Sequence, residues 1–170
     1  MPSVDLNRVP AFCHNYIRQV EKDDLREAFS FYPPAFTAFL ENIPEEKWGY
    51  RYAEDKWTIA ELVLHIIDAE RIFSYRALRI ARKDQTPLPG FDENPYVVHS
   101  KASSRTKESL INELKAVQHS TRLLFDSFDE EQLESSGTTS GASTYVRGIG
   151  FTLIGHSLHH QNILRERYLQ

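Results

Sequence analysis

Cysteine is almost missing from this chain, whose 170 residues contain only Cys13. A single cysteine excludes a disulfide within the chain and a metal site built from several thiolates. A metal ion bound here would therefore need histidine and carboxylate ligands. The scarcity of cysteine also fits the reducing conditions of the cytoplasm, where we expect the protein to work.

The sequence also lacks a long apolar run and an excess of positive charge. No stretch approaches the ~18 consecutive apolar residues of a membrane helix, and residues 1–8 do not resemble a signal peptide. Twenty lysines and arginines stand against 24 aspartates and glutamates, for a net charge of −4. Without a basic run, the chain has no electrostatic footprint for a nucleic-acid backbone. We therefore expect a cytoplasmic protein that binds neither membranes nor nucleic acid.

What the sequence does contain is enough apolar material for one core, because 41% of its residues are hydrophobic and 12% are aromatic. We expect residues 1–170 to form a single domain. Apolar residues recur at helical spacing in four segments, and no strand pattern is evident. The predicted fold class is all-α, a four-helix bundle with a long crossover connection through residues 85–95. A flexible loop is expected at residues 135–141. The predicted helices cover about 25–43, about 58–84, 110–128 and 143–164. The second of them begins at the capping box formed by Thr58 and Glu61.

The last predicted helix carries three histidines at informative spacing. His156 and His160 are four residues apart, so their rings lie on one face, within the apolar arc that contains Ile149 and Leu153. His159 lies at the edge of that arc. Two imidazoles in a core must satisfy their ring nitrogens. They could do so by hydrogen bonds to carboxylates or carbonyls, or by binding one cation.

The helix that begins after Thr58 carries two further candidates. His65 lies at the margin of its apolar arc and can lean toward a neighbouring helix. Glu70 lies in the middle of the arc, where a solvated acid is not expected. It could form a buried ion pair with an arginine of another helix.

Five segments follow one another in a specific order: residues 50–61 (YRYAEDKWTIAE), His65 with Glu70, residues 73–82 (FSYRALRIAR), residues 87–92 (PLPGFD), and residues 155–160 (GHSLHH). Together they resemble the DinB superfamily of metal-dependent enzymes, and the resemblance extends over residues 16–169. It implies a four-helix bundle that binds a divalent cation, often zinc or nickel, through three histidines. On this chain those histidines are His65, His156 and His160. Ser157 departs from the pattern, since many relatives carry glutamate there.

The resemblance also suggests an activity. Relatives include transferases that use low-molecular-weight thiols and a thiol-dependent isomerase, and many relatives form homodimers. Three histidine ligands leave a coordination position open for water or a thiol. The resulting hypothesis is a hydrolase or thiol S-transferase that activates water or a low-molecular-weight thiol, as co-substrate, for attack on a small electrophilic substrate. Glu70 would orient a ligand imidazole or act as a base.

Two alternatives accompany this hypothesis. The protein could be a non-catalytic metal-binding or dimeric interaction module, or it could bind no metal at all. Phe151 and Ile154 make the outer side of the last helix apolar, which suits either a central helix or a subunit contact in a homodimer. Arg76 and Arg147 could bind a substrate anion, although we favour a surface role for both.

Overall fold

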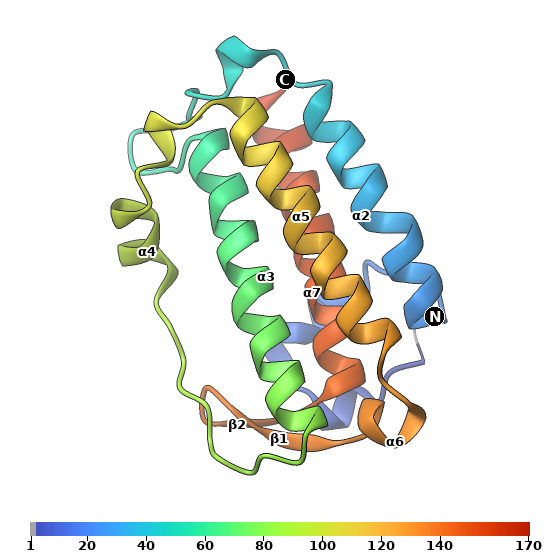
Figure 1. Cartoon of the computed structure of the whole chain (residues 1–170). Helices are drawn as coiled ribbons and strands as arrows, with labels where there is room; N and C mark the ends of the chain where they lie inside the picture. Colours follow the sequence, from blue (N-terminus) through green and yellow to red (C-terminus); the bar gives the residue numbers. More distant parts are fainter. Residues whose placement is uncertain (1–2) are drawn as a thin grey trace.

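Four long helices run side by side in the computed structural model, which describes residues 3–170 (Figure 1). The predicted helical bundle with a long crossover is confirmed, with a small two-stranded sheet added to it. The elements are α1 (His14–Ile17), α2 (Leu25–Glu41), α3 (Ile59–Ala81), α4 (Glu93–His99), α5 (Lys107–Asp126), α6 (Glu130–Leu133), β1 (Ser136–Thr139), β2 (Ala142–Tyr145) and α7 (Val146–Ile163), with short 3-10 turns at Leu6–Arg8, Ala11–Cys13, Glu45–Lys47 and Ala102–Ser104 and a π-helical turn at Leu164–Tyr168. The last helix, α7, packs against α1, α2 and α3.

Side-chain caps fix where the long helices begin. Thr58 accepts a hydrogen bond from the backbone of Glu61, and the Glu61 carboxylate accepts one from the backbone of Thr58, so the predicted capping box is confirmed. Helix α2 continues through Pro33 and Pro34, where the sequence favoured a kink or a new start. Phe29 and Phe36, on either side of the prolines, are both buried in the bundle. This packing stabilises the helix on both sides of the prolines.

The segment before α7 is a β-hairpin, and the predicted flexible loop at 135–141 and helix start at 143 are both wrong. Strand β1 pairs antiparallel with β2. The two residues of the turn, Ser140 and Gly141, have φ angles of 52° and 76°. A two-residue turn with positive φ at both positions matches the right-handed twist of paired strands. Helix α7 therefore begins at Val146.

The crossover after α3 is attached to this hairpin. The backbone N–H of Leu88 donates to the carbonyl of Thr138 at 2.9 Å, and the N–H of Ser140 donates to the carbonyl of Leu88 at 2.9 Å. Beyond this attachment the crossover leads to α4, which lies beside α3 and outside the main bundle (Figure 1). The crossover and the hairpin turn therefore both reach one side of α3.

Helix α7 is enclosed by the rest of the chain. Phe151 and Ile154, on the side that suited either a central helix or a subunit contact, are buried against other elements of the same chain. The central position accounts for their apolar character, and the expected homodimer stays a prediction. None of the described helices is long and apolar enough to span a membrane.

Candidate metal centre

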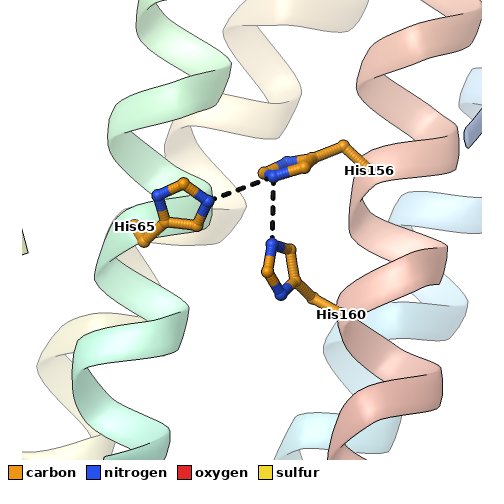
Figure 2. A group of neighbouring side chains, drawn as sticks. All are labelled: His65, His156 and His160. Atoms are coloured by element: carbon orange, nitrogen blue, oxygen red, sulfur yellow. Dashed lines mark hydrogen bonds between the residues drawn. The ribbon is translucent and has the colours of Figure 1, made fainter. Parts of the chain in front are cut away.

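Helices α3 and α7 bring His65, His156 and His160 together, with their rings pointing at one another (Figure 2). His156 Nε2 lies 3.1 Å from His65 Nε2 and 3.0 Å from His160 Nε2. The potential ligand atoms of the three rings all lie within 4.8 Å of one another. The spacing along α7 predicted the pair on one face, and the family resemblance supplied His65. The structure unites all three in one cluster.

The protonation of the rings suits metal binding. Burial lowers the pKa of His65 to about 4, against the opposing negative charge of Glu93. Burial also lowers the pKa of His156 to about 3 and that of His160 well below its usual value, and the neighbouring histidines add to both effects. At neutral pH all three rings are therefore uncharged. A neutral imidazole has one nitrogen with a free lone pair, which is the form that binds a metal.

The geometry also fits a cation better than a hydrogen-bond network. His156 Nε2 faces two other Nε2 atoms, yet it carries either one proton or one lone pair and cannot satisfy both neighbours well. Nitrogen ligands ~2.0–2.1 Å from zinc, at angles of about 90–110°, are separated by roughly 2.8–3.4 Å. The observed separations of 3.0 and 3.1 Å fall within that range. The arrangement of the three histidines is therefore compatible with the binding of one divalent cation.

Aromatic neighbours hold the rings from outside. The ring of Trp57 lies 4.9 Å from that of His65, and the ring of Tyr16, on α1, meets that of His156 edge-on at 5.5 Å. His160 Nδ1 has no hydrogen-bond partner within residues 3–170. Packing against His159, at 5.3 Å between ring centres, therefore orients the His160 ring in place of the usual second hydrogen bond. His159 itself is partly exposed, as predicted for the edge of the arc.

The cluster opens into a cavity of about 370 Å³ beside α3 and α7. Its charged wall residues other than histidine are Arg76 and Glu93. Another hollow, of about 420 Å³, lies between α2 and α5 and contains none of the three histidines. The cavity beside the cluster is therefore the candidate place for a metal-dependent reaction. The lining residues of that cavity are Phe12, Tyr16, Trp57, His65, Ala69, Phe73, Arg76, Phe91, Glu93, Ser140, His156 and His160.

A sequence model of the DinB superfamily matches residues 28–164 of the chain. The chain belongs to this superfamily. The resemblance inferred from the five segments is thereby confirmed.

Two comparisons place this DinB protein beside proteins described as hydrolases. A protein of Oceanobacillus iheyensis with the provisional name of metal-dependent hydrolase is 25% identical over 154 residues, which cover 86% of this chain and 80% of the relative. The structure of YfiT from Bacillus subtilis, described as a probable metal-dependent hydrolase with an unusual four-helix bundle topology, superposes with a TM-score of 0.71 at 14% identity. That match covers 96% of this chain and 93% of YfiT.

A third comparison is with a mycothiol-dependent maleylpyruvate isomerase, whose structure gives a TM-score of 0.69 at 11% identity. The match covers 85% of this DinB protein and 60% of the isomerase chain. At such low identities, the two structural matches establish the shared fold and leave the chemistry to the residues of the site.

Two residues of the cavity in this DinB protein were not singled out from the sequence. Glu93 begins α4 and is close enough to oppose the lowered pKa of His65 by its charge. Tyr16, on the short helix α1, has its pKa raised by burial and, to a smaller extent, by the charges of Cys13 and Glu93. Both residues lie on short helices outside the four long ones, where no repeated apolar spacing marks a face. The only available signal for Glu93 was its place on the long crossover, because long loops in compact domains often carry function.

The sequence had suggested a surface role for two arginines of this DinB protein. That expectation is wrong for Arg76, which is buried in the cavity wall. Arg147 forms ion pairs with Glu134 and Glu130 and does not line the cavity.

Glu70 is buried, as its place in the apolar arc predicted. Its carboxyl group is hydrogen-bonded to Thr121 and borders a small space inside the bundle together with Gln118 and Ser157. Among the described residues, Glu70 forms neither an ion pair with an arginine nor a hydrogen bond to the three histidines. Its predicted part in orienting a ligand or acting as a base stays a prediction.

Replacing Glu70 by glutamine should remove one pH dependence of stability. Burial raises the pKa of Glu70 to about 7, against the opposing hydrogen bond of Thr121. Between pH 4.5 and 7 the folded protein therefore holds this proton more tightly than the unfolded chain, so stability falls as the pH rises. Complete ionisation costs on the order of 3 kcal/mol. Urea unfolding at pH 5 and pH 8 should show that loss in the wild type and little of it in Glu70→Gln.

The exposed residue Glu54 provides the control, because Glu54→Gln should retain the wild-type difference between the two pH values. An undiminished difference in Glu70→Gln would contradict the assignment of this titration to Glu70.

Proposed function

We propose that this DinB protein is a metal-dependent enzyme in which His65, His156 and His160 hold one divalent cation, zinc or nickel. Its reaction is the attack of water or a low-molecular-weight thiol on a small electrophilic substrate. The observation that carries the proposal is the opening of the three-histidine cluster into a cavity large enough for a small molecule. Imidazole nitrogens suit both metals. The hydrolase names of relatives, and the thiol-dependent isomerase of similar fold, support the two candidate nucleophiles.

The ligand set favours catalysis over a purely structural site. Structural zinc sites in proteins are usually closed by four protein ligands, whereas catalytic sites keep a position open. Only three potential ligands form the cluster in the described part of the chain. When bound, such a cation lowers the pKa of water to about 7 or deprotonates a thiol, so a nucleophile is present at neutral pH.

Other residues of the cavity can transfer protons, stabilise a developing negative charge and limit the access of water. Glu93, whose charge acts on His65, can accept the proton released by the nucleophile or return one to the leaving group. Tyr16 has a raised pKa, so its hydroxyl stays protonated and can donate a hydrogen bond to a developing negative charge. The rings of Trp57 and Phe73 wall the cavity and limit the access of bulk water.

Turnover by metal-loaded protein tests this proposal. Purified protein is freed of metal with a chelator, reloaded with zinc or nickel, and assayed with 4-nitrophenyl acetate for hydrolysis. Cysteine or glutathione with 1-chloro-2,4-dinitrobenzene tests thiol transfer. We expect a metal-dependent rate in at least one assay, lowered by about 100-fold in His160→Ala, because a cation contributes several kcal/mol to such reactions.

His119→Ala is the control, because His119 is an exposed histidine of α5 that is absent from the cluster. It should retain most of the metal-dependent rate. If protein that contains one cation per chain shows no metal-dependent rate in either assay, the non-catalytic metal-binding module becomes the better description.

A further inference from the structure

Arg76 is the one buried arginine among residues 3–170, with 4% of its surface exposed. No aspartate or glutamate forms an ion pair with it in this part of the chain. Burying a charge without a counterion is costly, and proteins rarely retain one without a use for it. The missing counterion suggests that a negative charge comes from outside the chain.

Three segments hold the guanidinium group of Arg76 in place. Its Nη2 donates to the carbonyl of Pro89 at 2.8 Å and to the hydroxyl of Ser140 at 3.0 Å. The rings of Phe73 and Phe91 lie 5.3 and 5.8 Å from the centre of the guanidinium. Helix α3, the crossover and the hairpin turn therefore all contribute to its position. These neutral partners orient the positive charge without cancelling it.

The remaining donors of Arg76 are accessible to solvent. No hydrogen bond from Nη1 or Nε is found within residues 3–170. The fully enclosed side-chain nitrogens without a partner in this range are those of Trp48 and His160, so Nη1 and Nε of Arg76 keep contact with solvent. Arg76 lines the cavity that holds the histidine cluster, so a molecule in that cavity can approach these donors. Donors for an anion thus share one enclosed space with the histidines.

We propose that Arg76 binds the carboxylate of the substrate, so that the substrates are small, elongated carboxylic acids with their electrophilic carbon at the three histidines. This inference rests on the proposed function. His65 and Arg76 lie eleven residues apart on α3, about three helical turns, and line the same cavity, so a molecule that reaches both extends along the helix. Among the described residues of the cavity wall, Arg76 and the histidines are the basic ones, and Glu93 is acidic. One arginine matches a singly charged carboxylate better than a doubly charged phosphate.

Ligand binding to the metal-free protein tests this assignment without depending on the metal. The probes are hexanoate, its neutral counterpart hexanamide, and propylphosphonate. Binding is followed by the fluorescence of Trp57 in the cavity wall, in a Trp48→Phe background that removes the other tryptophan. Hexanoate should bind more tightly than either other probe. Arg76→Met should weaken hexanoate binding about tenfold or more, and leave hexanamide unchanged, because hydrogen bonds to a charged partner are lost.

Two controls keep the test specific. Arg82→Met removes an exposed arginine just after the same helix and should leave hexanoate binding unchanged. Arg76→Lys keeps the charge and should bind hexanoate more tightly than Arg76→Met. If either Arg76 variant fails to fold, the preference of the Arg76-containing protein for hexanoate over hexanamide still decides the question.

Three results would overturn the inference: equal binding of hexanoate and hexanamide, tighter binding of propylphosphonate than of hexanoate, or hexanoate binding by folded Arg76→Met at full affinity. None of them bears on metal content, which is measured separately. A protein that binds metal and turns over substrates without carboxylate preference would contradict this inference alone. A protein that prefers carboxylates but binds no metal would contradict the proposed function alone.

Discussion

Replacing His156 by alanine is expected to lower the affinity for zinc or nickel by about 100-fold or more. His156 Nε2 faces the Nε2 atoms of both His65 and His160, so its loss removes one ligand and leaves the other two without the ring that lies between them. If three imidazoles share a binding free energy on the order of 10 kcal/mol, one ligand contributes about 3 kcal/mol, which corresponds to roughly 100-fold in affinity. Elemental analysis after dialysis, and competition with a chromophoric chelator, measure this loss.

His119→Ala is again the control, because it removes an exposed histidine that lies outside the cluster. It should bind about as much metal as the wild type. Equal metal content in His156→Ala and the wild type would contradict the site. A similar loss in both variants would show that the effect does not come from the removal of a ligand of the cluster.

The same cluster predicts how metal binding depends on pH. Burial lowers the pKa of His65 to about 4 and that of His156 to about 3, so protons compete weakly with the metal at pH 6. Metal should therefore be retained well below pH 6.5, where exposed histidines become charged. In the metal-free protein the unfolded chain takes up these protons first, so stability should fall as the pH drops from about 6.5 toward 4.

The sequence was informative where local periodicity decides the structure. Repeated apolar spacing placed the four long helices, the capping box placed the start of α3 at Ile59, and the four-residue interval placed His156 and His160 on one face. The burial of Glu70 also followed from its place on the helix. Each of these features depends on residues within one element. Spacing could not assign His65 to the cluster, because it lies on α3 and no spacing rule relates α3 to α7. The resemblance to the family made that assignment.

The remaining features depend on contacts between distant segments. Two short strands of serine, threonine and alanine carry little hydrophobic pattern, so the turn at Ser140 and Gly141 was the sole local sign of the hairpin. From the sequence alone, Arg76 is expected on the surface of α3. Its burial depends on the carbonyl of Pro89 and the hydroxyl of Ser140, which come from other segments. Glu93 reaches the cavity only because the crossover returns past α3. Long-range packing of this kind leaves no periodic trace in the sequence.

Replacing Gly155 by alanine is expected to lower the free energy of unfolding by about 2–3 kcal/mol, although alanine is intrinsically better than glycine in a helix by about 1 kcal/mol. A Cβ atom at position 155 would lie 2.1 Å from the backbone oxygen of Tyr16 and 2.4 Å from its carbonyl carbon. Backbone atoms cannot rotate away as a side chain can, so α1 must move off α7. The clash therefore outweighs the gain in helix propensity, and urea unfolding measures the difference.

The displacement should also reach the metal centre, because the ring of Tyr16 packs 5.5 Å from that of His156 and lines the cavity. Gly155→Ala should thus bind metal more weakly than the wild type even under conditions where it is fully folded. Gly49→Ala is the control, since a Cβ atom there has no neighbour within 4 Å, and it should change neither property appreciably. A Gly155→Ala variant as stable as the wild type would contradict the close contact of α1 with α7. A destabilised variant with unchanged metal affinity would show that α1 stabilises the bundle without shaping the site.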